Sequence, residues 1–210
     1  MSEKRDALDD EKRPQVSRRE FTWCAAGFAG MLAVGGVGVA FGGTKELLRP
    51  PGGQDEDAFR AACLKCDKCR SICPQDCLTI AVMEDGLLNY RTPYMDYRKG
   101  YCTFCDECIT VCPTDALGTG FDPETERIGL AVIDEDECLA FIDSGACRRC
   151  ADVCEFEAIT INELNHPVVD ESLCNGCGEC EYECPSDVYL SYSASGRRGI
   201  NVEYAEGERP

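Results

Sequence analysis

Cysteine dominates the chemistry available to this chain, because 18 of its 210 residues are cysteine. Three sets have the spacing C-x2-C-x2-C-x3-C, and a proline follows each set directly. Two-residue gaps let a tight loop wrap three thiolates around one face of a metal cluster, while the fourth cysteine points toward a second cluster. This spacing is typical of [4Fe–4S] clusters. The predicted ligands are Cys63, Cys66, Cys69 and Cys73 (motif 1), Cys102, Cys105, Cys108 and Cys112 (motif 2), and Cys174, Cys177, Cys180 and Cys184 (motif 4).

A fourth set is irregular. In "CLAFIDSGACRRCADVC", residues 138–154, the first gap is eight residues long and the proline is replaced by Glu155. The pattern V-[VI]-D-E-x-x-C precedes both Cys138 and Cys174, and "EFEAITI" after Cys154 matches the segments that follow the other motifs. We therefore predict that motif 3 consists of Cys138, Cys147, Cys150 and Cys154, with six residues inserted as a surface loop. A degenerate site with a void or a different cluster is the alternative.

Two cysteines fall outside the motifs, and we expect neither to be a ligand. Cys77 occupies the position held by Ala116, Ala158 and Val188 in the other copies, a small apolar site that would pack behind a cluster. Cys24 lies in a weakly apolar run and is expected to act as a small apolar side chain. The inserted loop, residues 140–146, is either a place for contact with a partner or a solvated decoration.

Zinc and disulfides are the competing explanations for so many cysteines. Zinc sites usually pair two C-x-x-C units, and a third cysteine two residues later would crowd one tetrahedral ion. Disulfide frameworks occur in exported chains, but they do not usually space cysteines three apart in repeated runs. The repeat therefore favours four [4Fe–4S] clusters.

The motifs also predict the fold class, which is α+β, small and rich in loops. Each repeat should be a short strand, a cysteine loop with a helical turn, and a second short strand; residues 129–134 and 166–170 are expected strands. Two repeats make one ferredoxin-like module, because the fourth cysteine of each half binds the cluster of the other. Residues 59–194 thus form two modules and residues 195–210 a tail. Pairing can be consecutive (1 with 2, 3 with 4) or nested (1 with 4, 2 with 3).

The N-terminal region resembles a signal for protein export. Residues 17–23 are "SRREFTW", and an uncharged, glycine-rich run follows to residue 43, which together resemble a twin-arginine signal. We expect residues 1–43 to be a cleaved signal or a loose membrane anchor, since about twenty uncharged residues could span a bilayer. Residues 44–58, with two prolines and two glycines, are expected to be a linker, and "DEDAFRAAC" a short helix.

The net charge and the absence of nucleotide-binding and catalytic motifs narrow the range of possible functions. A net charge of −18 and a pI near 4.4 argue against nucleic acid as a partner. They indicate either a solvated acidic surface or steering toward a basic protein patch. The single histidine, His166, precedes a proline in an expected turn, and no nucleotide-binding fingerprint is present. No catalytic residue is predicted, so the chain is expected to be an electron carrier rather than an enzyme.

A family resemblance covers most of the chain. "LLRPPGGQDEDAFRAACLKCDKCRSICP", "RTPYMDYRKGYCTFCDEC" and "RIGLAVIDEDECLAFIDSGACRRCADVC" are similar to exported ferredoxin-like proteins of the NapG/MauM type, whose motif 3 also has a long first gap. The resemblance implies four [4Fe–4S] clusters and electron transfer from a quinol-oxidising membrane partner to an exported reductase, in the best-known case nitrate reductase. It implies a periplasmic location or the outer face of the cytoplasmic membrane, with membrane association through a partner or an uncleaved N-terminus.

Two points are left open by this resemblance. The chain differs from the family at Glu155, where the family tends to have proline, and in shorter segments near motifs 3 and 4. A subunit of another molybdoenzyme, of the dimethyl sulfoxide or formate type, is therefore the alternative function. Four-cluster subunits of such enzymes, which this arrangement resembles, are nested, and this slightly favours nested pairing here.

Overall fold

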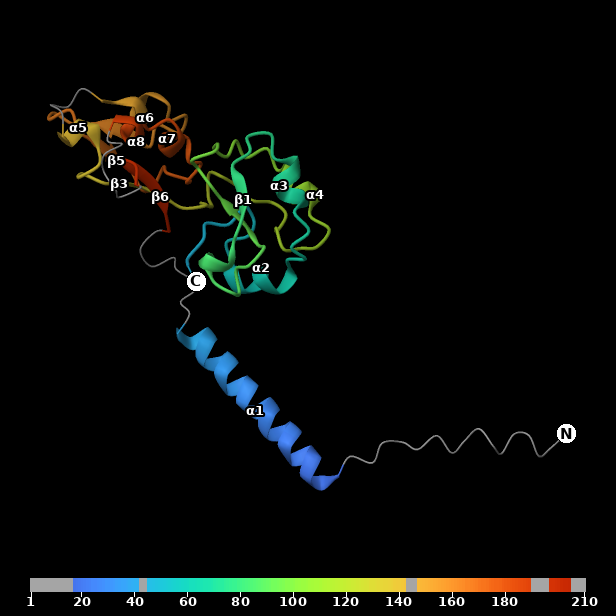
Figure 1. The fold of residues 1–210 in the computed structure, drawn as a ribbon. Helices are drawn as coiled ribbons and strands as arrows, with labels where there is room; N and C mark the ends of the chain where they lie inside the picture. Colours follow the sequence, from blue (N-terminus) through green and yellow to red (C-terminus); the bar gives the residue numbers. More distant parts are fainter. Residues whose placement is uncertain (1–16, 42–44, 143–146, 190–196, 205–210) are drawn as a thin grey trace, which may run out of the picture. The chain divides into compact units, whose positions relative to one another are not determined.

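The computed structural model describes residues 17–41, 45–142, 147–189 and 197–204 (Figure 1). The chain divides into two compact units, residues 1–43 and 44–210. The first unit contains helix α1 (Arg18–Phe41). The N–H of Glu20 donates to Oγ of Ser17 at 3.2 Å, and the N–H of Ser17 donates to the Glu20 carboxylate at 2.9 Å. This capping box starts the helix at the two adjacent arginines.

Within the four described ranges, no helix combines the length and the apolar character needed to cross a bilayer.

The second unit begins with an N-terminal module, residues 45–126, which carries motifs 1 and 2. Its strands pair as an antiparallel hairpin from Leu78↔Met95 to Ile80↔Pro93, and α3 and α4 lie side by side (Figure 1). Phe59, Tyr97 and Leu117 are in its buried core. Its elements are α2 (Glu56–Ala62), α3 (Lys68–Ile72), β1 (Leu78–Ile80), the 3-10 turn η1 (Met83–Asp85), β2 (Pro93–Met95) and α4 (Glu107–Val111).

The C-terminal module, residues 127–204, carries motifs 3 and 4. Strands β4 and β5 form a hairpin, and β3 pairs antiparallel with β6 from Leu130↔Glu203 to Ile133↔Ile200. The strands expected at residues 129–134 and 166–170 are confirmed as β3 and β5. Its elements are β3 (Leu130–Ile133), α5 (Leu139–Ile142), α6 (Arg149–Asp152), β4 (Ile159–Ile161), β5 (Pro167–Val169), α7 (Glu179–Tyr182), α8 (Ser186–Tyr189) and β6 (Ile200–Glu203).

The segment expected to be a linker is packed into the N-terminal module. The Arg49 side chain is 0% exposed, and its guanidinium donates to both carboxylate oxygens of Glu56, at 2.6 and 2.5 Å. It also donates to the side-chain oxygens of Asn89 and Thr92 and to a backbone carbonyl. The expected helix is confirmed as α2, where the Asp55 carboxylate accepts the N–H of Ala58 at 3.0 Å. Residues 45–55 lack helix and strand, as predicted, but they are structural and not a free connection.

The segment expected to be a C-terminal tail contains β6. Ile200 and Val202 are buried, and the Arg198 guanidinium donates to the carbonyls of Glu181 and Tyr182 at the end of α7. The Glu181 carbonyl also accepts the N–H of Cys184 at 3.2 Å, so the arginine adds a side-chain donor at the end of the helix. The chain after motif 4 therefore closes the module.

The prediction of a strand after every motif was wrong for motif 2, and for motif 4 it falls largely on residues 190–196, which lie outside the described residues. Within the described residues, strands β1 and β4 follow motifs 1 and 3, irregular backbone follows motif 2, and α8 follows motif 4. Cys77, Ala116 and Ala158 are buried as expected, whereas Val188 is 74% exposed. Val188 lies on the short helix α8, whereas Cys77, Ala116 and Ala158 lie outside helices and strands.

Candidate functional site

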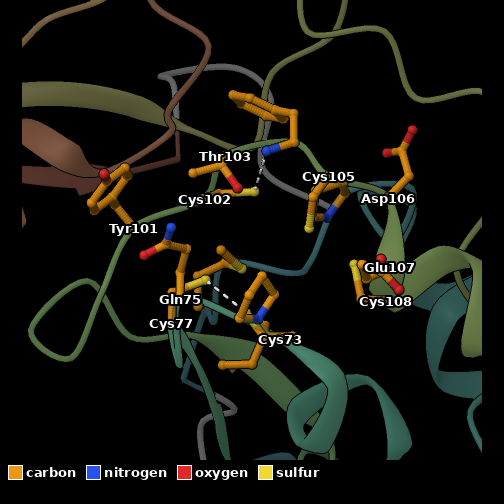
Figure 2. A pocket seen from close by; sticks show the side chains of 15 residues that line it. Cys73, Gln75, Cys77, Tyr101, Cys102, Thr103, Cys105, Asp106, Glu107 and Cys108 are labelled. Carbon is orange, nitrogen blue, oxygen red and sulfur yellow. Dashed lines mark hydrogen bonds between the residues drawn. The ribbon is translucent and has the colours of Figure 1, made fainter.

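Four small hollows contain all sixteen cysteines of the motifs, four in each. Every hollow is lined by the first three cysteines of one motif and the fourth cysteine of another. Figure 2 shows one of these hollows, where Cys73 of motif 1 faces Cys102, Cys105 and Cys108 of motif 2. We number the hollows by the motif that supplies three cysteines: hollow 1 (Cys63, Cys66, Cys69, Cys112), hollow 2 (Cys102, Cys105, Cys108, Cys73), hollow 3 (Cys138, Cys147, Cys150, Cys184) and hollow 4 (Cys174, Cys177, Cys180, Cys154).

Pairing of the motifs is consecutive, so the preference for nesting was wrong. Motifs 1 and 2 exchange their fourth cysteines, as do motifs 3 and 4. The cause lies in the short hairpins: β1–β2 connects motif 1 to motif 2, and β4–β5 connects motif 3 to motif 4. A hairpin returns the chain beside its starting point, which brings each helical turn next to that of the following motif.

The three regular motifs share an unusual backbone conformation. In each, the second and fourth residues after the first cysteine have positive φ angles, the left-handed region that is uncommon for residues other than glycine. This conformation curls the loop so that N–H groups face its interior, as in anion-binding nests. The N–H groups of Lys65 and Phe104 accordingly donate to the sulfur of the preceding first cysteine, both at 3.4 Å. The residues are Lys65 and Asp67, Phe104 and Asp106, and Gly176 and Gly178.

Motif 3 also places its first three cysteines around a hollow, but its loop has different backbone angles. Arg148, the equivalent of Asp67, has a φ of −135°. Cys138 lies immediately before α5, and the structure brings it together with the other cysteines of hollow 3. Ala140 is buried and Phe141 stacks on His166 with ring centroids 3.9 Å apart, so the start of the insertion packs against the module instead of projecting as a loop. The rest of it, residues 143–146, lies outside the described residues.

Side chains near the fourth cysteines differ among the hollows, and the sequence analysis missed this. Oγ of Ser186 lies 3.3 Å from Sγ of Cys184. The N–H of Gly199 donates to the same Oγ at 2.7 Å, which leaves the hydroxyl hydrogen available to the sulfur. In hollow 2, Sγ of Cys77 lies 3.5 Å from Sγ of Cys73. Cys77 is thus beside a predicted ligand, Cys73. For the contact at Cys184, the signal in the sequence was Ser186, which follows Cys184 and Pro185 directly.

The electrostatics of the hollows disfavour thiolates in the absence of a positive charge. Burial raises the pKa of Cys69, Cys102 and Cys150 to about 12. Cys73 is an exception: a hydrogen bond from the Cys77 thiol lowers its pKa to about 6. Only the thiolate binds metal, and a bound metal deprotonates the thiol. The donor set of each hollow therefore fits a cationic iron–sulfur centre held by four cysteines.

The geometry fits zinc and disulfides less well. In a tetrahedral zinc site with Zn–S bonds near 2.3 Å, sulfur atoms are about 3.8 Å apart. In the part of the chain that the structure describes, no three Cys, His, Asp or Glu residues are arranged to hold a single ion. All eighteen cysteines lie in the described ranges, and they are free thiols. The sixteen motif cysteines line hollows instead of converging on single points.

Comparison with known proteins identifies the same two-motif units. A family model described as a 4Fe-4S dicluster domain matches residues 62–116 and 145–188, which are motifs 1 and 2 and most of motifs 3 and 4. Each matched range falls within one module, in agreement with consecutive pairing.

Curated relatives cover most of the chain. "Ferredoxin-type protein NapG" of Escherichia coli K12 is 37% identical over 197 residues, which cover 82% of this chain and 83% of the relative. "Methylamine utilization ferredoxin-type protein MauM" of Methylophilus methylotrophus is 35% identical, with 76% of each chain covered. "Ferredoxin-type protein NapF" of Escherichia coli K12 is 34% identical over 66% of this chain and 80% of the relative. The chain therefore belongs to the NapG/MauM family of ferredoxin-type iron–sulfur proteins.

Proposed function

We propose that this protein carries four [4Fe–4S] clusters, one in each hollow, and uses them to transfer electrons. The observation that carries the proposal is the grouping of sixteen cysteines into four sets of three plus one. Clusters bound entirely by cysteine accept and release single electrons, at potentials set by hydrogen bonds to sulfur, nearby charge and exposure. The chain's own residues hold the sulfur ligands, exclude water and supply the N–H and O–H groups around them.

The proposed path runs from a quinol-oxidising membrane partner to an exported oxidoreductase of the nitrate reductase type. Membership of the NapG/MauM family supports this assignment. Export by the twin-arginine route, to the periplasm or the outer face of the cytoplasmic membrane, is proposed from Arg18 and Arg19 and the uncharged run that follows them. The net charge of −18 would favour docking on basic surfaces of these partners.

An electron carrier fits the side chains around the hollows better than an enzyme does. His166, the single histidine of the sequence, has its ring stacked on Phe141 and does not line any of the four cysteine hollows. The lining of hollow 1 is mostly cysteine and apolar side chains, among them Phe59, Ala116 and Leu117. Such an apolar lining shields a redox centre, and the charged residues at its border, Lys65, Asp67 and Lys68, belong to the cysteine loop itself.

The first test is the metal content of the intact protein, purified without oxygen. Four clusters predict roughly sixteen iron and sixteen sulfide per chain, a brown colour, and electron paramagnetic resonance signals after reduction. Iron and sulfide analysis with spin integration measures this directly. A colourless protein that contains zinc and no sulfide would contradict the proposal.

The second prediction concerns the irregular motif. Cys138→Ala removes one of the four sulfur ligands of hollow 3, so the iron content should fall by about four, and the reduced protein should lose about one spin. Cys77→Ala is the matched control, because Cys77 is also buried beside a hollow but is not a proposed ligand. Equal iron in the Cys138 variant and the wild type would show that Cys138 is not a ligand.

The third prediction concerns export. Replacement of Arg18 and Arg19 by lysine keeps the charge but removes the arginine pair, and the protein should then remain in the cytoplasm. Cell fractionation followed by immunoblotting measures the distribution. The control replaces Arg148 and Arg149 by lysine, another adjacent pair, and should be exported normally. Export of the Arg18 and Arg19 variant at the wild-type level would argue for a different route.

A further inference from the structure

We propose that electrons cross between the two modules at the contact between Cys102 and Cys177, which places the hollows in the order 1–2–4–3. The inference rests on the proposed function, since it assigns a path among the clusters. It makes hollows 2 and 4 the inner pair and hollows 1 and 3 the two ends, where partners would deliver and collect electrons.

The central observation is a direct hydrogen bond between two predicted ligands. The backbone N–H of Cys102, which lines hollow 2, donates to the carbonyl of Cys177, which lines hollow 4, at 2.8 Å. A path from one sulfur to the other therefore needs only the covalent bonds of these two residues and one hydrogen bond. Electron tunnelling declines more slowly through such bonds than through empty space.

Aromatic contacts join the same two hollows. The ring of Phe104, which lines hollow 2, meets the ring of Phe156, which lines hollow 4, edge-on with centroids 6.0 Å apart. Tyr101 also lines hollow 2, and its ring centroid lies 5.8 Å from that of Tyr182 on α7. These ring pairs add side-chain contacts between the residues around the two hollows to the backbone hydrogen bond.

Tyr97 is the positioning residue of this crossing. Its side chain is 3% exposed, and its hydroxyl donates to the carbonyl of Gly176 at 2.6 Å. A Cβ atom added to Gly178 would lie 2.0 Å from the Tyr97 ring, so the ring packs directly on the backbone there. Gly176 and Gly178 flank Cys177. Tyr97, from the N-terminal module, therefore holds the loop that presents Cys177 to Cys102.

The rest of the order follows from the exchange of cysteines within each module. Hollows 1 and 2 share motifs 1 and 2, since Cys73 and Cys112 each extend from one motif into the hollow of the other. Hollows 3 and 4 share motifs 3 and 4 in the same way, through Cys154 and Cys184. With the crossing at hollows 2 and 4, the sequence of neighbours is 1–2–4–3.

The test uses magnetic coupling between reduced clusters, because neighbouring unpaired spins split and broaden each other's resonance signals. Four double alanine variants each empty one hollow. Emptying hollow 2 should isolate hollow 1, and emptying hollow 4 should isolate hollow 3, so each variant should show one sharp, uncoupled signal of about one spin per chain. Emptying hollow 1 or hollow 3 should leave three coupled signals and no sharp one. The pairs are Cys66 and Cys69, Cys105 and Cys108, Cys147 and Cys150, and Cys177 and Cys180.

The opposite pattern would overturn the order: a sharp signal after emptying hollow 1 or hollow 3, and none after emptying hollow 2 or hollow 4. Iron analysis of the wild type keeps this failure separate from failure of the proposed function. Roughly sixteen iron with the wrong coupling pattern refutes the order alone, whereas absence of iron refutes the function.

A second variant tests the crossing with every cysteine in place. Tyr97→Phe removes the hydroxyl that holds the Cys177 loop, so the splitting between the two inner signals should decrease while the iron content is unchanged. Tyr204→Phe is the matched control, because its hydroxyl also donates to a backbone carbonyl, that of Leu47 at 2.8 Å, and Leu47 belongs to none of the cysteine motifs. Equal splitting in both variants would show that Tyr97 does not position the crossing.

Discussion

The structure of the folded unit depends on the exchange of one cysteine between paired motifs. Cys73, Cys112, Cys154 and Cys184 each leave their own motif and complete the hollow of its neighbour. The exchange works only if two helical turns lie close together, and the hairpins β1–β2 and β4–β5 provide this proximity. Burial raises the pKa of Cys69, Cys102 and Cys150, which line hollows 1, 2 and 3, so these three thiols would stay neutral without metal. Metal binding and folding should therefore be linked.

Polar interactions stabilise two segments of the folded unit that lie outside its small apolar core. The Arg49–Glu56 pair is buried, which is unfavourable unless the remaining donors find partners, and here Asn89, Thr92 and the carbonyl of Pro93 accept them. Arg198 has a similar role at the other end of the chain, where it donates to the last carbonyls of α7. Small domains usually need metal or disulfides in addition to their core, and this unit has two buried arginine networks beside its cysteine hollows.

Local features of the fold were predictable from the sequence, whereas the long-range ones were not. Cysteine spacing and the matched flanks of Cys138 and Cys174 depend on a few adjacent residues, as do β3, β5 and α2, and these expectations agree with the structure. Motif pairing could not be read in this way, because nested and consecutive arrangements need the same spacing. Residues 44–58 were expected to be a linker because proline and glycine indicate irregular backbone, yet irregular backbone can be buried when a side chain such as Arg49 anchors it.

Motif 3 shows how a long-range contact can replace a local one. The regular motifs curl their loops with left-handed residues, whereas Arg148 of motif 3 is not left-handed, and an insertion separates Cys138 from Cys147. The pairing of β3 with β6 replaces this local constraint on Cys138. The start of β6 lies beside the end of β3, and just before it the Gly199 carbonyl accepts the N–H of Asp134 at 3.1 Å. Gly199 passes so near Cys138 that an added Cβ would lie 2.6 Å from the Cys138 Cα. The position of Cys138 is thus fixed by the end of the chain, which explains how a motif with a stretched first gap can still line a hollow with three others.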